Sequence, residues 1–308
     1  MNRDLPMLLV VAFAGLWQLG VAQNSAPPEN APATVSAYVP PVELIRAASA
    51  NELAQADDNS HKHAFRSIKR NASGSQTRLY VETNEAMAGM TIAYNDKPLT
   101  PEQLQGEEDH LHYLERDAGA RRAKHDRELE ELDRTRRILK ALPDAFLYDY
   151  DGSAAGTDKM ARLGIKLTRL RFRPNPNYSP PSRIEQVLTG MKGFVLVDPV
   201  SHHLALLDAT LERDVSFGWG LFGHLDKGGS LLLSQVALDD GMWVLDELRM
   251  KFTGKILLFK NLNVNSDEEL DQFTPVPADL TFAQAVERIE AERNKLAASS
   301  AAGAPVQH

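Results

Sequence analysis

The strongest constraint on the fold lies in residues 193–264, where apolar and polar side chains alternate in segments broken by short turns. The even positions of 242–252 carry Met242, Val244, Leu248, Met250 and Phe252. Successive strand side chains point to opposite faces, so this pattern predicts a strand with one apolar and one solvated face. Thr253-Gly254-Lys255 predicts a short turn into a second strand over 256–264. Strands joined this tightly are antiparallel.

Similar patterns extend the sheet on both sides of this region. Strands are predicted over 63–70, 77–83, 87–94, 144–150, 166–173, 184–188, 193–197, 203–213 and 230–238. Helices are predicted over 42–55 and 281–296. The sequence therefore predicts an α+β fold with one large, curved antiparallel sheet, a half-barrel of about ten or eleven strands.

Residues 101–142 are dense in Asp, Glu, Lys and Arg and predict a charged helical insertion. Thr100 supplies a helix cap and Pro101 suits the first helical position. Gly119 is expected to divide the segment into two helices, and Pro143 to end it. One interpretation is a solvated insertion packed through a thin apolar seam. The other is a mobile lid or an arm that binds a partner.

The N-terminal segment of the chain predicts export. Residues 1–22 are typical of a cleavable signal peptide, with Arg3, an apolar core over 7–19 and small residues before the cleavage site. The alternative is an uncleaved anchor. Residues 23–41 predict a disordered linker, 42–296 a single α+β domain and 297–308 a disordered tail. The chain has no cysteine, so neither lipidation through a cysteine nor a disulfide is expected, and a periplasmic or secreted protein is indicated.

Composition and motifs exclude several function classes. A net charge of −8 argues against nonspecific binding to nucleic acid or to an anionic membrane. No P-loop, dinucleotide fingerprint or Gly-x-Ser-x-Gly elbow is present. Histidines occur in pairs, such as His61 with His63 and His202 with His203, but no further ligand stands at a metal-binding spacing. Neither a cofactor nor a metal is predicted.

The run Phe146-Leu147-Tyr148-Asp149-Tyr150-Asp151-Gly152-Ser153 resembles the first motif of haloacid-dehalogenase phosphatases. In that family the first Asp is a nucleophile and the second a general acid or base. The family also needs a parallel sheet with a helix after this motif, whereas antiparallel strands are predicted here. We therefore interpret the run as an edge strand entering an Asp-Gly turn, and keep the phosphatase only as a remote alternative.

Two further patterns indicate binding surfaces. Arg169, Arg171 and Arg173 share one strand face, which is either an ordinary solvated face or a contact for an anionic head group. A glycine-rich hinge over 217–223 presents aromatic side chains that either fill the core or form an apolar lip. The predicted ligand-binding residues, as cavity or lip, are Phe172, Phe217, Trp219, Phe222, Met242, Leu248, Met250, Phe252 and Leu258. Ordinary core packing of the same residues is the competing account.

Four runs within 171–282 resemble a group of exported bacterial proteins of unknown function. They are Arg171–Pro176, Val215–Gly220, His224–Gly229 and Phe252–Lys255. That group is in turn similar to the lipoprotein-carrier (LolA/LolB-like) superfamily. The resemblance implies a LolA-like domain, an incomplete barrel whose concave face holds an acyl chain under helices. The charged insertion departs from the carriers, and no functional residue of theirs matches position by position.

The function predicted from these features is a non-enzymatic, exported binding or carrier protein. Its ligand would be hydrophobic, either a lipid or the acyl chain of a lipoprotein. The alternative is a structural or interaction protein of the bacterial envelope that docks a protein partner through the charged helical insertion.

Overall fold

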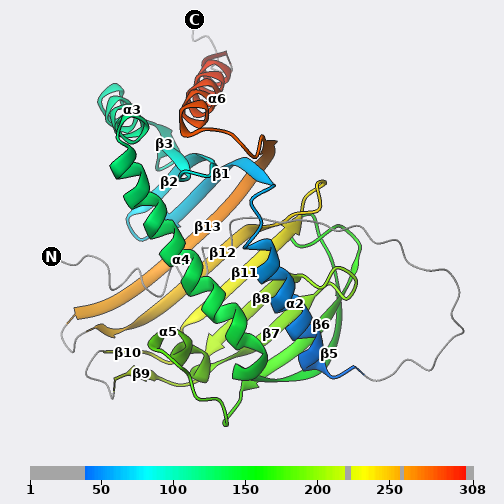
Figure 1. The fold of residues 1–308 in the computed structure, drawn as a ribbon. Helices are drawn as coiled ribbons and strands as arrows, with labels where there is room; N and C mark the ends of the chain where they lie inside the picture. The colour runs from blue at the N-terminus through cyan, green and yellow to red at the C-terminus, as the bar shows by residue number, and fades with distance from the viewer. Residues whose placement is uncertain (1–38, 219–222, 257–259, 303–308) are drawn as a thin grey trace, which may run out of the picture. The chain divides into compact units, whose positions relative to one another are not determined.

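The computed structural model describes residues 39–218, 223–256 and 260–302, with the helices and strands shown in Figure 1. Contacts within the chain divide it into two compact units. Unit 1 contains the described residues up to Asp58 and Glu131–Asn265, and unit 2 contains Asn59–Glu130 and the described residues from Ser266. Each unit is built from two separate stretches, so the chain passes between them three times.

Among the described residues the strands pair antiparallel, and 13 of them are assigned to one sheet. Together with the helices this confirms the predicted α+β class with a large antiparallel sheet. The sheet has more strands than predicted because three of them span only two or three residues. These are β4 (Lys97–Pro98), β9 (Val215–Phe217) and β10 (Gly223–Leu225).

In unit 1 the strand order is β12-β11-β8-β7-β6-β5, with β10 paired to β12 and to β9. The bounds are β5 (Phe146–Ala155), β6 (Lys166–Pro174), β7 (Met191–Val197), β8 (Leu204–Leu211), β11 (Ser230–Ala237) and β12 (Trp243–Ile256). Strands that are neighbours in this sheet also follow one another along the chain, apart from β9 and β10. Most loops between paired strands are therefore short.

Helix α2 (Pro41–Gln55) lies across the strands of unit 1 and covers one face of the sheet (Figure 1). Pro41 suits the first turn, where an amide N–H has no partner inside the helix. Ile45 and Ala48 are almost completely buried. The predicted helix over 42–55 is thereby confirmed, and the side of the sheet beneath it is called here the helix-covered face.

The predicted turn at Thr253-Gly254-Lys255 is wrong, because these residues continue β12. Gly254 pairs with Leu225 of β10, and a β-carbon added to Gly254 would lie 2.1 Å from the carbonyl oxygen of His224. The glycine therefore allows β12 and β10 to approach closely, and it does not reverse the direction of the chain. β12 ends at Ile256 and β13 begins at Lys260, so the predicted strand over 256–264 belongs to two strands.

A β-bulge in β12 at Asp246 corrects a second expectation, that the even positions of 242–252 share one face. Val244 pairs with Val236, whereas Leu248 pairs with Leu233. Val236 and Leu233 are three positions apart in β11 and point to opposite faces. Val244 therefore faces away from Leu248, because the extra residue inverts the alternation.

Residues 184–188, predicted as a strand, form helix α5 (Arg183–Gln186) and a 3-10 turn (Val187–Gly190). The hydroxyl of Ser182 accepts the N–H of Ile184 at 3.2 Å and donates to the carboxylate of Glu185. This is helix-capping chemistry, and it prevails over the apolar run that favoured a strand.

In unit 2 the strand order is β4-β3-β2-β1-β13. The bounds are β1 (Lys62–Asn71), β2 (Gly74–Val81), β3 (Ala88–Tyr94) and β13 (Lys260–Val276), the last entering unit 2 at Ser266. Helix α6 (Phe282–Ala302) continues past the predicted helix end at 296 into the predicted tail. The core of the unit consists of Leu79, Val81, Ala86, Ala88, Met90, Leu111, Leu114, Phe282, Ala285, Val286 and Ile289.

The charged segment forms α3 (Pro101–Arg116) and α4 (Ala118–Ala145), as a helical insertion predicts. The helices separate at Asp117 rather than at Gly119, because the side chain of Asp117 accepts the N–H of Ala120 at 2.9 Å and so caps α4.

α4 also runs past Pro143, its predicted end, to Ala145. The hydroxyl of Tyr148 donates to the carbonyl of Leu142 at 2.8 Å, which satisfies one of the acceptors in the last helical turn.

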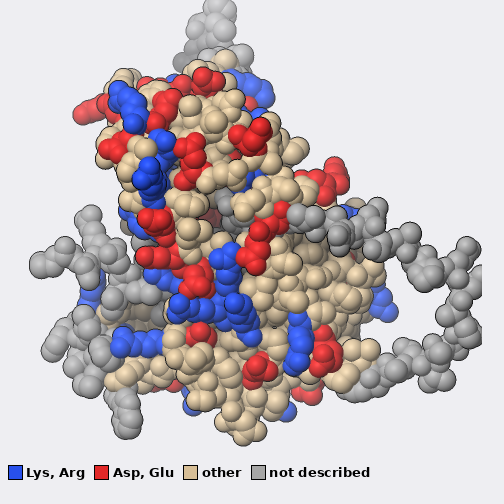
Figure 2. Space-filling model, viewed as in Figure 1, with Lys and Arg blue, Asp and Glu red and all other residues tan. Residues whose placement is uncertain are grey.

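Basic and acidic side chains alternate along the charged segment (Figure 2). Several pair within their own helix, as Lys124 does with Glu128 and Arg137 with Asp133. Such exposed pairs contribute only about 0.3–0.5 kcal/mol each. The pattern agrees with the solvated insertion, while the lid or partner-binding arm stays a prediction.

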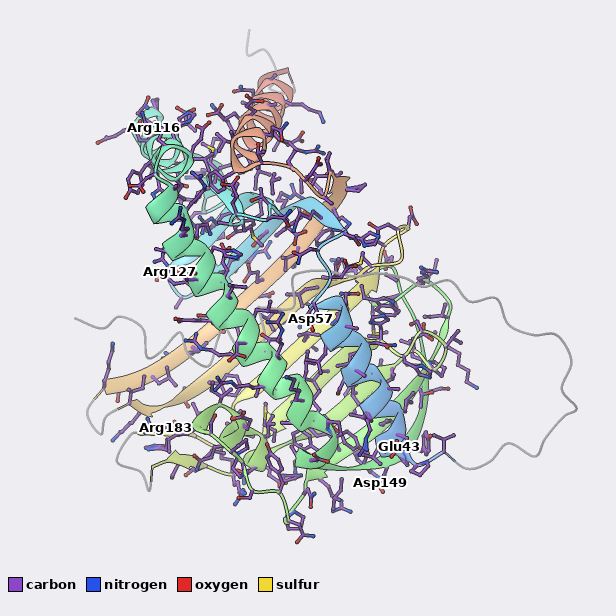
Figure 3. All side chains as sticks on the ribbon, viewed as in Figure 1. Glu43, Asp57, Arg116, Arg127, Asp149 and Arg183 are labelled. Carbon is purple, nitrogen blue, oxygen red and sulfur yellow. The ribbon has the colours of Figure 1, made fainter. Side chains whose placement is uncertain are left out.

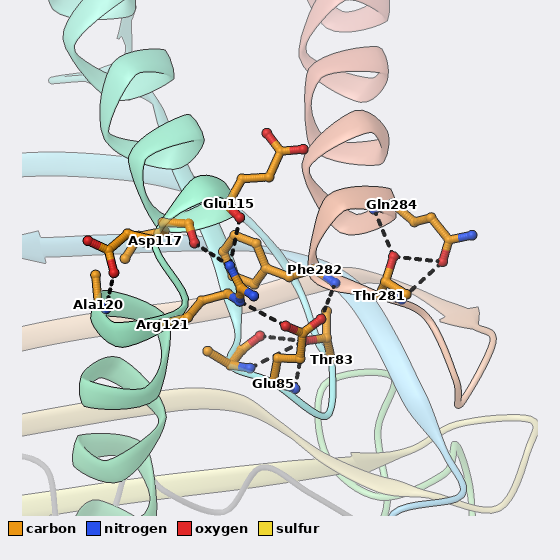
Figure 4. A network of polar contacts seen from close by, with 11 residues as sticks. Thr83, Glu85, Glu115, Asp117, Ala120, Arg121, Thr281, Phe282 and Gln284 are labelled. Atoms are coloured by element: carbon orange, nitrogen blue, oxygen red, sulfur yellow. Dashed lines mark hydrogen bonds and ion pairs between the residues drawn. The ribbon is translucent and has the colours of Figure 1, made fainter.

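A polar network in unit 2 joins the end of α3, the start of α4, the β2–β3 connection and the start of α6 (Figure 4). Nη1 of Arg121 donates to the carbonyls of Leu114 and Glu115 at 2.8 and 2.6 Å, and its Nε donates to Glu85 at 2.8 Å. Glu85 also accepts the N–H of Phe282 at 3.0 Å. One arginine and one glutamate thus satisfy backbone groups at two helix ends.

Glu82 follows β2 and is a buried carboxyl with 2% exposure. Its Oε2 accepts the N–H of His63 at 2.8 Å, yet burial raises its pKa from 4.5 to about 7. Between those values the folded protein holds a proton that the unfolded chain releases. The free energy of unfolding should therefore fall as the pH rises through this window.

Glu82→Gln should remove this pH dependence. We expect the wild-type protein to lose about 2–3 kcal/mol of unfolding free energy relative to the variant between pH 5 and pH 8. Urea denaturation at both pH values measures the difference. Parallel pH profiles of the two proteins would contradict the assignment of a proton to Glu82.

The predicted signal peptide over 1–22 lies outside the described residues, as does the predicted linker up to residue 38. Among the helices that the structure describes, none combines the length and the apolar character needed to cross a lipid bilayer.

Candidate ligand-binding site

The candidate site is a pocket of about 810 Å³ in unit 1. It is lined by Arg162, Ile165, Lys166, Thr168, Asp198, Pro199, Val200, Ser201, His203, Gly241 and Trp243. These residues come from the loop between β5 and β6, the start of β6, the turn between β7 and β8, and the turn before β12 with the first residue of β12. Ligand pockets of about 300–1,000 Å³ with apolar, aromatic and a few charged walls are typical of small-molecule sites.

Glu52 of α2 lies behind the pocket wall with 1% exposure. Its Oε1 accepts the N–H of Leu204 at 3.0 Å and lies 3.1 Å from Nδ1 of His203. Its Oε2 accepts from Nε2 of Gln235 at 3.3 Å. The carboxylate of Glu52 thus holds Nδ1 of His203 within hydrogen-bond distance. Glu52 thereby fixes the orientation of the imidazole.

Nε2 of His203 is the ring atom that remains for a ligand. It has no hydrogen-bond partner among the residues that the structure describes, and His203 itself lines the pocket. A neutral imidazole with a protonated Nδ1 offers Nε2 as an acceptor, and an imidazolium offers it as a donor. Either form gives the pocket a polar group held from behind by a buried carboxylate.

The indole of Trp243 forms the wall beside this imidazole. The two rings stack with centroids 5.2 Å apart and an interplanar angle of 15°. Gln55 holds Trp243 from α2, since its Nε2 donates to the Trp243 carbonyl at 2.6 Å and its Oε1 accepts the Trp243 N–H at 3.1 Å. Glu52 and Gln55 are three positions apart on one helix face, so one element positions both rings.

The loop over 156–165 contributes Arg162 and Ile165 to the pocket lining. The N–H of Gly156 donates to the carbonyl of Ile165 at 2.8 Å, and Ala161 exchanges backbone hydrogen bonds with β11 at 2.6 and 3.1 Å. A β-carbon added to Gly156 would lie 2.1 Å from the carbonyl oxygen of Arg162, so the loop closes only with glycine there. The loop is thereby fixed to the sheet.

Positive charge is in excess at the pocket. Arg162 and Lys166 are exposed and make no ion pair with any residue that the structure describes. The carboxylate of Asp198 is occupied within its own turn, where it accepts the N–H of Val200 at 2.9 Å and the hydroxyl of Ser201 at 2.7 Å. Two cations therefore remain available to an anionic group of a ligand.

The ligand-binding residues predicted from sequence lie elsewhere. Phe172 is buried on β6 against Phe146, with ring centroids 4.6 Å apart. Met242, Leu248, Met250 and Phe252 are buried at or in β12, which three strands (β11, β8 and β7) separate from β6 in the sheet order. Phe217 ends β9 and is half-buried, and Trp219, Phe222 and Leu258 lie outside the described residues. None of the described residues of this set lines the pocket at Trp243, and their role in ligand binding stays a prediction.

Sequence reasoning missed Glu52, Gln55 and Trp243. His203 was noted only as one of a histidine pair. A signal existed in α2, where a glutamate and a glutamine three positions apart occupy the same side as buried Ile45 and Ala48. Polar side chains on an apolar helix face need buried partners, which points to a polar site beneath the helix.

The run resembling the phosphatase motif lies on β5, where Asp149 and Asp151 form ion pairs with Arg173 and Arg169 across to β6. β5 and β6 are antiparallel, unlike the parallel sheet that the phosphatase interpretation requires. The run therefore gives that remote alternative no structural support.

Comparison of the chain with protein-family models, with curated proteins and with solved structures found no match. The resemblance to lipoprotein carriers stays a prediction, and function has to be argued from the pocket.

Proposed function

We propose that this protein is a non-enzymatic binding or carrier protein for an amphipathic anion, a molecule with an apolar part and a negatively charged group. The observation that carries the proposal is the pocket where the stacked His203 and Trp243 lie together with the unpaired cations Arg162 and Lys166. The proposal keeps the hydrophobic ligand expected from the sequence and adds a charged head to it.

The pocket walls match the two halves of such a ligand. Ile165 and Pro199 offer apolar surface, while Trp243 lines the pocket with only 4% of its surface exposed. Arg162 and Lys166 offer charged donors, whose hydrogen bonds to anions contribute about 1.5–3 kcal/mol. Val200 adds an apolar rim, as 86% of its surface is exposed.

We place this activity outside the cytoplasm, in the periplasm or in secreted form, on the basis of the signal-like residues 1–22. A lipid or the acyl chain of a lipoprotein would then be the natural ligand, delivered or received by an envelope protein. Mass spectrometry of the protein recovered from a bacterial envelope tests this location by showing whether the chain begins after Ala22.

Binding of dodecanoate and of dodecanol, measured by calorimetry and tryptophan fluorescence, tests the proposal. We expect the carboxylate to bind more tightly than the alcohol. The double variant Arg162→Gln with Lys166→Gln should weaken dodecanoate binding by about tenfold or more, since one lost charged contact is worth about that factor. Dodecanol binding should change little.

Lys159→Gln is the matched control, because Lys159 is exposed in the same loop but does not line the pocket. It should bind dodecanoate like the wild type. Equal losses in the control and the double variant, or no binding of either probe by the wild type, would exclude the proposal. Organic extraction of the purified protein followed by lipid mass spectrometry then identifies the natural ligand.

A further inference from the structure

A second charged site lies on the other face of the unit 1 sheet. Arg169, Arg171 and Arg173 alternate along β6 with buried Leu170 and Phe172 and share the opposite side. Cross-strand pairs place Arg171 in one row with Phe194, Asp208 and Leu232. Leu232 and Leu233 are consecutive in β11 and so point to opposite faces. Leu233 shares its face with Gln235, whose side chain bonds to Glu52 of α2 on the helix-covered face. The arginine row therefore faces away from the helix-covered face.

This row borders a groove of about 620 Å³. Its charged lining consists of Arg169, Arg171, Arg173, Lys192, Asp149, Asp151 and Glu212. Figure 3 labels Asp149 on β5. Counting these side chains gives four cations and three carboxylates, an excess of one positive charge in a chain whose net charge is −8. This excess of positive charge is local to the groove.

Three of the cations are engaged with carboxylates or rings. Nε of Arg169 lies 3.2 Å from Asp151, and its guanidinium stacks 3.8 Å from the centroid of Phe194. Arg173 lies 4.0 Å from Asp149, and Lys192 lies 3.5 Å from Glu212. The last two pairs are long, and exposed pairs of this kind are weak.

Arg171 stands in the centre of the row and is exposed. It forms no ion pair with any residue in the described part of the chain, although Asp149 is its cross-strand neighbour on β5. Its guanidinium fork therefore remains available, with Arg173 next to it on the same face of β6 and Lys192 of β7 across from Arg173. A planar fork with further cations beside it suits the several oxygens of a phosphate group.

We propose that this groove binds a phosphate group through Arg171, with Arg173 and Lys192 adding charge beside it. The group belongs either to a soluble phosphorylated molecule or to the head group of an anionic phospholipid. This site is separate from the pocket at His203 and Trp243, since the lining residues of the two do not overlap.

The test compares wild type, Arg171→Gln and Lys251→Gln. Lys251 is exposed on β12 and does not line the groove, so its variant is the matched control. Calorimetry with glycerol 3-phosphate probes the soluble source. Sedimentation with phosphatidylglycerol vesicles, against phosphatidylcholine vesicles, probes the head group. We expect Arg171→Gln to weaken binding of at least one phosphate probe by about tenfold, and Lys251→Gln to leave it unchanged.

The two sources are distinguished by which probe responds. Loss of glycerol 3-phosphate binding alone assigns a soluble ligand, whereas loss of vesicle binding assigns a lipid head group. Absence of phosphate-dependent binding by the wild type, or equal binding by the Arg171 and Lys251 variants, overturns the proposal. Dodecanoate binding should be normal in Arg171→Gln, which separates failure here from failure of the pocket at Trp243.

Discussion

Replacement of Glu52 by alanine should lower the free energy of unfolding by about 3–5 kcal/mol. The carboxylate is 1% exposed and accepts from the backbone of Leu204, from Gln235 and from His203. Its removal leaves these donors buried without an acceptor, and each unsatisfied group carries a large desolvation cost. Urea denaturation followed by tryptophan fluorescence measures the loss, and the same signal reports the stacking of Trp243.

Glu52→Gln separates hydrogen bonding from packing. It keeps the shape of the side chain and one acceptor oxygen. Its new amide can also donate to Oε1 of Gln235, which has no hydrogen-bond partner in the described part of the chain. We expect less than half the loss found for Glu52→Ala. Equal losses in both variants would show that the acceptor role of Glu52 does not stabilise the fold.

Phe282→Ala should destabilise unit 2 by a similar amount, about 3–5 kcal/mol. The ring is 1% exposed at the start of α6 and packs in the core with Val286, Ile289 and Leu111. Truncation leaves a cavity whose walls cannot fully collapse, which adds to the lost burial. It also removes the ring beneath the guanidinium of Arg121, 5.6 Å from the centroid. Circular dichroism during urea denaturation measures the effect.

Phe282→Leu is the control because it keeps most of the apolar volume. Its loss should stay below about 1.5 kcal/mol. The backbone N–H of residue 282, which donates to Glu85, is present in every variant. A loss in Phe282→Leu as large as in Phe282→Ala would point to the ring contact with Arg121 rather than to cavity formation.

Local sequence patterns were enough to predict the antiparallel sheet, the helix that precedes its strands and the helix that follows them. The pattern around Leu170 and Phe172 and the pattern of 248–252 each reappear as buried and exposed positions of a strand. Such a pattern shows which side chains of a strand are buried, and residues close together in the sequence are enough to define it.

The errors arose where distant residues decide. Gly254 indicated a turn, yet its role depends on His224 of β10, which only the folded sheet brings near. The bulge at Asp246 inverts the faces of β12 without any residue that marks it in the sequence.

The candidate site was hidden for the same reason. Glu52 and His203 are 151 positions apart, so the pattern of α2 indicates a polar site beneath the helix but not the residues that complete it. Arg171 was recognisable as part of a row on one strand face. Which arginine of that row lacks an ion pair is set by Asp149 and Asp151 on the neighbouring strand.

The passage of the chain between the two units sets the order in which a ribosome can complete them. α2 is synthesised early, but its sheet follows only after 59–130 has emerged. β1 must wait for β13, as shown by Arg66 and Asp271, which bond across 205 positions. Contacts so distant in sequence form slowly. A nascent chain that has not reached Ser266 therefore carries an unpaired edge on β1, the stage at which it most needs protection from aggregation.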